Sequence, residues 1–178
     1  PRQCCNKGGG CMNLSELGAY KHKVAGLFAS DPDIIDLMLG PVDDDTDTDE
    51  MLLGDDKDSC GHIYEFEYTP DINETTDTYL CMETVVAKAP TDTAYRVYLY
   101  VFAYCHKKIM QNYKKEGRLG TRADILAEDV DRLLNGNPDF GIGLVRLVNN
   151  EVYKPVNNYY GRCLCYEIQS FNRKRGTK

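Results

Sequence analysis

The chain has 178 residues, of which 42% are hydrophobic and 28% charged, and this composition indicates one soluble globular domain. Its net charge of −7 argues against general nucleic-acid binding, which needs a basic surface to release counterions. The apolar runs are too short to span a bilayer and no signal-peptide core follows the N-terminus, so we expect no membrane segment and folding in a cytoplasm. The thirteen Tyr and five Phe must fill the core without Trp, and Tyr is common at interfaces.

We expect three parts along the chain. Residues 1–12 (PRQCCNKGGGCM) form a Gly- and Cys-rich N-terminal arm without hydrophobic periodicity, which predicts flexibility. Residues 13–172 form a single domain, and residues 173–178 form a basic tail. Such a tail is usually a solvated end, but its cations are also interface candidates, able to meet phosphates or an acidic patch on a partner: Arg173, Lys174 and Arg175.

Two helices are predicted at the start of the domain. Residues 13–29 place apolar side chains at helical spacing, and Asn13 with Glu16 resembles a capping box. Residues 30–40 (SDPDIIDLMLG) predict a short helix that Asp31 caps, with Pro at its first position and Gly at its end.

An acidic stretch, residues 43–58, follows the second helix. Its charges predict a solvated, self-repelling loop. Asp45, Asp47 and Asp49 alternate as in a calcium loop, but the Gly and Glu that an EF-hand requires are missing. An alternative role is a negative wall that keeps DNA from adhering to a channel.

Strands are predicted at 62–68, 77–90 and 93–107 from alternating and β-branched or aromatic residues. The third is apolar on both faces, which predicts a central strand covered on both sides. Helices would cover one face, and a second sheet or a neighbouring subunit could cover the other. An ordinary intramolecular core is the alternative for the aromatic row on that second face, which we take as interface candidates: Tyr98, Tyr100, Phe102 and Tyr104.

The clearest helix follows a basic, polar stretch at 105–120 that is expected to be partly helical. Thr121 is the predicted N-cap, with Asp124 three residues later, and Gly136 fits the left-handed position after the helix. Its apolar stripe predicts packing on the sheet. Charged residues lie off this stripe. They are either a solvated face or, in an assembly, a set that aligns one subunit against the next: Asp124, Glu128, Asp131 and Arg132.

Two more strands are predicted at 140–148 and 159–171. The order of elements therefore predicts an α+β fold: a mostly antiparallel sheet of about five strands with helices packed on one face, a flexible N-terminal arm and a C-terminal tail.

The chain has eight cysteines, which we expect to be free thiols in a reducing cytosol, those in the strands acting as small hydrophobes. A weak alternative is a zinc site, although the C-x-x-C spacing is missing; its ligands would be Cys4, Cys5, Cys11, Cys60 and His62. A third possibility is disulfides between subunits through Cys4, Cys5 or Cys11, because a flexible arm can bring thiols together.

No catalytic motif is present: the sequence has no G-x-S-x-G, P-loop, G-x-G-x-x-G or H-E-x-x-H. Cys105 and His106 are neighbours in a strand, so they point to opposite faces and are poorly placed as a nucleophile and its base. We therefore expect a protein that is not an enzyme and has no cofactor.

Several stretches resemble the small neck and tail-completion proteins of tailed bacteriophages. They are RVYLYVFAYCHK, GTRADILAEDVDRLLNG, FGIGLVRLV and YYGRCLCYEIQSFN, with DPDIIDLMLG near the start, and the resemblance covers residues 14–172. It carries an R-x-D-x-L helix that ends in Leu-Leu-Asn, a short Gly-rich strand and a closing strand after Tyr-Gly-Arg. These are patterns of fold and not catalytic signatures.

Within that group the layout is most similar to tail terminators, which form a ring that joins the tail tube to the head-side connector. The resemblance implies a structural virion protein without enzymatic activity, assembled in the host cytoplasm into a ring that is commonly a hexamer. Its partners would be itself, the adjacent connector and the tail-tube or sheath proteins, with DNA passing through the lumen. The Cys-rich arm and the acidic stretch depart from the pattern, so a stopper or an adaptor of the same stack remains an alternative.

Overall fold

A computed structural model describes residues 15–43, 45–54, 61–70, 76–91, 94–114, 117–141 and 143–171. Its helices are α1 (Ser15–Ala29), α2 (Pro32–Leu39), α3 (Thr48–Leu53) and α4 (Arg122–Leu134). Its strands are β1 (Ile63–Tyr64), β2 (Thr78–Thr91), β3 (Ala94–His106), β4 (Arg146–Tyr153) and β5 (Tyr159–Phe171). The predicted N-terminal arm and the basic tail lie outside the described residues.

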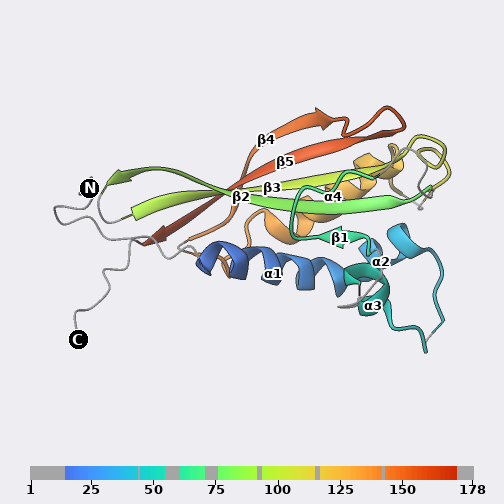
Figure 1. Cartoon of the computed structure of the whole chain (residues 1–178), viewed down its shortest axis with the longest axis horizontal. Helices are drawn as coiled ribbons and strands as arrows, with labels where there is room; N and C mark the ends of the chain where they lie inside the picture. Colours follow the sequence, from blue (N-terminus) through green and yellow to red (C-terminus); the bar gives the residue numbers. More distant parts are fainter. Residues whose placement is uncertain are drawn as a thin grey trace, which may run out of the picture.

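The strands form one sheet in the order β1-β2-β3-β5-β4, so β3 is central as predicted. Every neighbouring pair is antiparallel except β1 and β2, which are parallel. Figure 1 shows α1 running along the long strands, with α2 and α3 at its C-terminal end and with β1 and β4 at opposite edges of the sheet. The predicted α+β class is confirmed.

The main core lies between the helices and one side of the sheet, which we call the inner face. Odd-numbered residues of β3 point into it, because side chains alternate along a strand. Val97, Leu99, Val101 and Ala103 have no exposed surface there and pack with residues of α1, α2 and α4. The even-numbered residues of β3 point to the opposite side, which we call the outer face.

Local caps explain where the two best-predicted helices begin and end. Asp31 caps α2 by accepting hydrogen bonds from the backbone of Asp33 and Ile34. Thr121 and Asp124 form the predicted capping box of α4, in which each side chain binds the backbone of the other. Gly136 follows α4 with a φ of 83°, the left-handed conformation that glycine adopts without strain.

The acidic stretch is not a loop throughout, because residues 48–53 form α3. Asp47 caps this helix by accepting a hydrogen bond from the backbone of Glu50, and acidic residues in a first turn favour a helix N-terminus. Leu52 is completely buried. The apolar Met-Leu-Leu run inside the acidic stretch is the local pattern that indicates this helix.

Two predicted strands have different bounds in the structure. The strand expected at 62–68 is only Ile63–Tyr64, and the chain then leaves the sheet. The strand expected at 140–148 begins at Arg146, because Gly141 and Gly143 take positive φ values of 62° and 80° that interrupt an extended strand. The expected partial helix at 105–120 is a series of hydrogen-bonded turns among its described residues.

Gly161, in the Tyr-Gly-Arg motif, is required by close packing of β5 on β3. A Cβ atom at this position would lie 2.0 Å from the carbonyl oxygen of Ala103 and 2.5 Å from Cα of Tyr104. No real side chain fits such a distance, so the motif sets the spacing of the two central strands.

Candidate assembly interface

The outer face of the sheet is covered over part of its length. No described helix lies on the outer side of β3, where the aromatic row of the strand points. Along this row the burial changes from half-buried Tyr98 and Tyr100 to fully buried Tyr104. The row therefore has a covered end and an open end.

The covered end is an aromatic cluster made by the chain itself. Residues 64–68 and 153–159 fold over the outer face and stack on β2 and β3. Tyr104 lies 5.6 Å from Tyr79 between ring centroids, and its hydroxyl donates a 2.6 Å hydrogen bond to the carbonyl of Tyr68. Burial raises the pKa of Tyr104 far above its ordinary value. Tyr104 is therefore part of the core and not an interface residue.

Phe102 lies at the border of this cluster. Its ring centroid is 4.6 Å from that of Tyr153, and the side chain is half-buried. Tyr153 in turn donates a 2.6 Å hydrogen bond to Glu67. At this end the cover is neither a second sheet nor another subunit. It consists of residues 64–68 and 153–159 of the same chain, so the alternative of an ordinary intramolecular core holds here.

The open end of the outer face centres on Tyr98 and Tyr100. Cross-strand pairing places Val85 of β2 beside Tyr98 and Cys165 of β5 beside Tyr100. Val85 is 48% exposed. Arg96 and Glu167 flank this patch with an ion pair of 3.5 Å. The result is a small apolar and aromatic surface on β2, β3 and β5, the kind of surface that protein interfaces favour.

The described cysteines behave as the sequence predicted. Cys81, Cys105 and Cys165 are buried and Cys163 is partly buried, and all four are free. Burial raises the pKa of the Cys81 and Cys163 thiols to about 11 and that of Cys105 to about 12. They are therefore protonated at neutral pH and poor nucleophiles.

Cys105 and His106 point to opposite faces, as expected. The Cys105 thiol lies 3.6 Å from the sulfur of Met110, whereas the ring of His106 packs edge-on against Tyr159 with centroids 5.1 Å apart. They do not form a nucleophile and base pair.

The four charges that lie off the stripe of α4 already have partners within the chain. Asp124 accepts hydrogen bonds of 3.0 and 2.8 Å from Arg162. Glu128 pairs with Arg118 at 3.1 Å, and Asp131 accepts a 3.1 Å hydrogen bond from the hydroxyl of Tyr166. Arg132 pairs with Asp31 at 2.9 Å. A charge reversal at Asp131 would therefore disturb buried Tyr166 as well as any contact with a neighbouring subunit.

The sequence reading missed Asp129, whose side chain is 1% exposed. Arg118 approaches both of its carboxylate oxygens through Nη1, at 2.7 and 2.9 Å, and also donates to the carbonyl of Ile125. Arg132 approaches the same carboxylate at 3.3 Å. A buried aspartate needs such partners. Its position between the apolar residues Ala127 and Val130 is the feature of the sequence that indicates a buried side chain.

The zinc and disulfide hypotheses fall mostly outside the described residues, which include neither Cys4, Cys5, Cys11 nor Cys60. Arg173, Lys174 and Arg175 are outside them too. His62 is described, and its Nδ1 lies 3.0 Å from the carbonyl oxygen of Thr78. Among the described residues no group of three or more His, Cys, Asp or Glu side chains is arranged to hold a metal ion.

The two lateral edges of the molecule have different surfaces. At the β1 edge, α1, α3 and residues 63–66 enclose a groove of about 460 Å³. Its lining is mostly apolar and includes Ala25, Gly26, Leu53, Ile63 and Phe66. At the β4 edge, Val148 and Val152 are 54% and 52% exposed. The groove was not predicted, although a glycine inside a helix pattern, here Gly26, was a possible signal.

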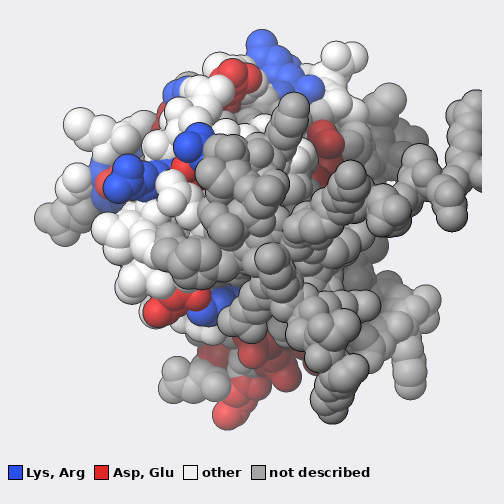
Figure 2. Space-filling view, turned by 90° about the vertical axis from the view of Figure 1, so that its left-hand side faces the viewer, with Lys and Arg blue, Asp and Glu red and all other residues white. Residues whose placement is uncertain are grey.

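Charges of both signs are mixed at one end of the molecule. In Figure 2, which views this end, Lys and Arg lie beside Asp and Glu over the described atoms, and acidic residues gather at the lower edge. The described atoms of this end therefore form no continuous basic area of the kind that a nucleic-acid interface needs. Among the described helices, none has the length and apolar character needed to cross a membrane.

The fold and these surfaces define an α+β protein whose single sheet carries helices on one face and a half-open aromatic row on the other. The YomW family model matches residues 31–168, and the chain belongs to the YomW family. This family is phage-derived, which indicates a phage protein. No curated protein matches the chain.

Proposed function

We propose that the chain is a structural virion protein that forms a homo-oligomeric ring in the neck of a tailed phage, where it joins the tail tube to the head-side connector. In this role it resembles a tail terminator and has no enzymatic activity. The phage origin of the family supports this setting. The sequence resemblance to neck proteins supplies the specific role.

The observation that carries the proposal is the half-open outer face of the sheet. Tyr98, Tyr100 and Val85 form a partly exposed apolar patch on β2 and β3. A subunit of an assembly can bury such a patch against a neighbour. The buried, protonated thiols fit a packing role better than a nucleophilic one.

The proposed partners follow from the position in the stack. They are further copies of the chain, commonly six in terminator rings, together with the connector above and the tail-tube or sheath proteins below. DNA would pass through the lumen without sequence-specific binding, and the net charge of −7 would keep it from adhering. Assembly would take place in the host cytoplasm, before the ring is built into the virion.

A second neck role, as a stopper or adaptor, is the nearest alternative, and a zinc-stabilised binding module is a more distant one. Zinc analysis of the purified full chain separates the last from the others. A bound zinc equivalent whose chelation unfolds the protein would favour the binding module.

The location in the particle tests the proposal. Immunogold electron microscopy of virions of the encoding phage, with antibodies against this chain, should label the junction between head and tail. Label along the tail tube or on the capsid would contradict a neck role, and absence of the chain from purified virions by mass spectrometry would reject a virion protein altogether.

A further inference from the structure

The two edges of the sheet lie at matching positions along the strands. The pairing places Ile63, Leu80, Ala103, Arg162 and Val152 in one row across all five strands. Ile63 is thus at one edge and Val152 at the other, in the same row. A second copy beside the first, in the same orientation, would bring these two residues together.

The strand directions at the two edges are also compatible. β1 runs parallel to β2, whereas β4 runs opposite to β5, which in turn runs parallel to β2. β4 and β1 therefore run in opposite directions. If the sheet continues from one copy to the next, β4 of the first lies antiparallel to β1 of the second, the more favourable of the two pairings.

The side chains at the two edges point to the same side of the sheet. Ile63 belongs to the core on the inner face, as do the next two residues of its row, Leu80 and Ala103. Val152 therefore also points to the inner side. Val148 is the extra residue of the β-bulge between Leu147 and Asn149, where the alternation of side chains is interrupted, so the placement on the inner side rests on Val152.

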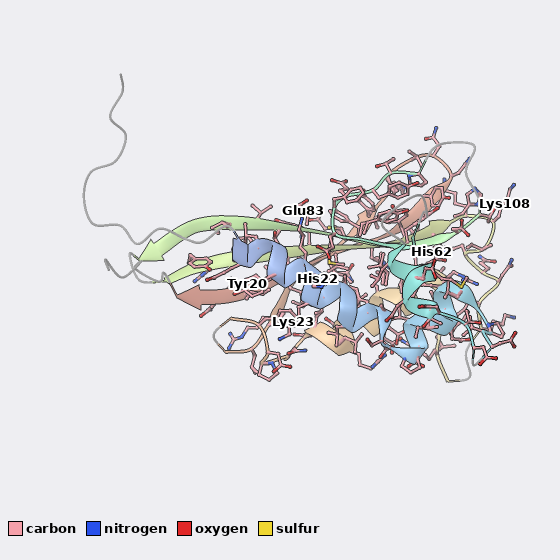
Figure 3. All side chains as sticks on the ribbon, turned by 60° about the horizontal axis from the view of Figure 1, so that its bottom comes forward. Tyr20, His22, Lys23, His62, Glu83 and Lys108 are labelled. Carbon is pink, nitrogen blue, oxygen red and sulfur yellow. The ribbon has the colours of Figure 1, made fainter. Side chains whose placement is uncertain are left out.

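One edge carries exposed valines and the other carries a groove. At the β4 edge, Val148 and Val152 are more than half exposed, with Asn150 between them on the same side as Val152, and we call this strip the Val148–Val152 ridge. At the β1 edge, the groove offers apolar walls and an open floor, because a Cβ built on Gly26 meets no atom within 4 Å. Figure 3 shows the helical side of the molecule, with α1 in front of the strands and His22, which also lines the groove, near the middle of the helix.

We infer that the groove formed by α1, α3 and residues 63–66 receives the Val148–Val152 ridge of a second copy of this chain. The inference rests on the proposed self-assembly and names a second contact, separate from the outer-face patch of Tyr98, Tyr100 and Val85. The two surfaces are different and lie on opposite edges, so the contact is heterologous. Repetition of such a contact closes into a ring when the rotation per subunit allows it.

The groove side has a matched pair of variants. Gly26→Leu places a large side chain in the groove, whereas Gly18→Leu places the same side chain on the same helix outside it, and neither position has atoms within 4 Å of a built Cβ. Both changes replace glycine inside a helix with a better helix former, so both favour the fold to a similar extent. We expect Gly26→Leu to weaken self-association at least about tenfold, equivalent to 1.4 kcal/mol, and Gly18→Leu to leave it unchanged, by sedimentation velocity.

The ridge side has its own control. Val148→Glu with Val152→Glu puts charges on the ridge, whereas Leu119→Glu changes an aliphatic side chain that is 95% exposed in the connection before α4. The ridge variant should lose self-association and the Leu119 variant should keep it. Circular dichroism and thermal unfolding test whether each variant remains folded, which we expect because the altered valines are more than half exposed.

A mixture of the two defective variants gives the decisive result. Gly26→Leu keeps an intact ridge and the double glutamate variant keeps an intact groove, so the mixture should form a one-to-one heterodimer that cannot grow further. Native mass spectrometry detects this species. If the wild-type protein assembles and both variants assemble equally well, the inference is wrong and the proposed ring stands. If the wild-type protein is strictly monomeric, both the inference and the proposed ring are contradicted.

Discussion

At the scale of single residues, the structure separates side chains that looked alike in the sequence. Tyr98, Tyr100 and Tyr104 occupy equivalent positions of one alternating row, yet only Tyr104 is sealed into the core. The difference comes from residues 64–68 and 153–159, which fold over one end of the row. A pattern within one strand cannot reveal a cover that arrives from distant parts of the chain.

Removing one hydroxyl from this row should therefore have unequal effects. Tyr104→Phe removes the donor to the Tyr68 carbonyl in a buried site, and we expect the free energy of unfolding to fall by about 1–2 kcal/mol. Tyr98→Phe, at the open end, should change it by less than about 0.5 kcal/mol. Urea unfolding of both variants checks this, and equal stability of the two would show that the aromatic cluster is not closed.

A second pair of variants compares Asp129, whose carboxylate is buried in α4, with its exposed neighbour Glu128. Asp129→Asn removes the charge that Arg118 and Arg132 approach, and we expect a loss of about 2–3 kcal/mol of unfolding free energy, typical of hydrogen bonds to charged groups. Glu128→Gln, at a side chain that is 63% exposed, should cost less than about 1 kcal/mol. Denaturant titration at neutral pH measures both. A larger loss for the Glu128 variant would contradict the burial assigned to Asp129.

At the scale of elements, the sequence predicted best where local chemistry decides the structure. Asp31 and Thr121 cap their helices as expected, and the long apolar strands β2, β3 and β5 lie within one or two residues of their predicted bounds. The misses share a cause. α3 is short and hidden in acidic sequence, and β1 ends after Tyr64 because the chain turns to cover the outer face. Tertiary contacts set these boundaries.

The start of α4 should give stability a dependence on pH. Burial alone would raise the pKa of Asp124, but hydrogen bonds from Thr121 and Arg162 lower it below its ordinary value of 3.8. A carboxyl group whose pKa is lower in the folded state stabilises the fold above its unfolded pKa, and this contribution is lost as the pH falls through the folded value.

Asp124→Asn should therefore be less stable than the wild type at pH 7, by about 1 kcal/mol, the size of a lost cap interaction. The difference should shrink as the pH falls below 3.8. Asp139→Asn, an identical change of charge at an exposed position, serves as the control. Thermal unfolding between about pH 2.5 and pH 7, a range that spans the ordinary pKa of an Asp side chain, measures the effect. If the difference in stability between the wild type and Asp124→Asn stays constant over this range, Asp124 is not held as a carboxylate.

At the scale of the whole molecule, the features that bear on function were only partly predictable. The α+β class and the central position of β3 follow from hydrophobic patterns, because these report burial directly. The groove beside α1 and the ridge on β4 do not, because they arise where elements from different parts of the chain meet. The charges of α4 show the same limit: the sequence marks them as polar, and only the fold shows that Arg118, Arg162 and Tyr166 bind them within the chain.

The assembly state of the purified full-length chain tests the central claim most directly. Native mass spectrometry at micromolar concentration should find one closed oligomer of defined stoichiometry, with no series of growing chain lengths, because repeated heterologous contacts that close leave no free end. A strictly monomeric protein over the whole concentration range would contradict the account of this chain as a ring-forming subunit.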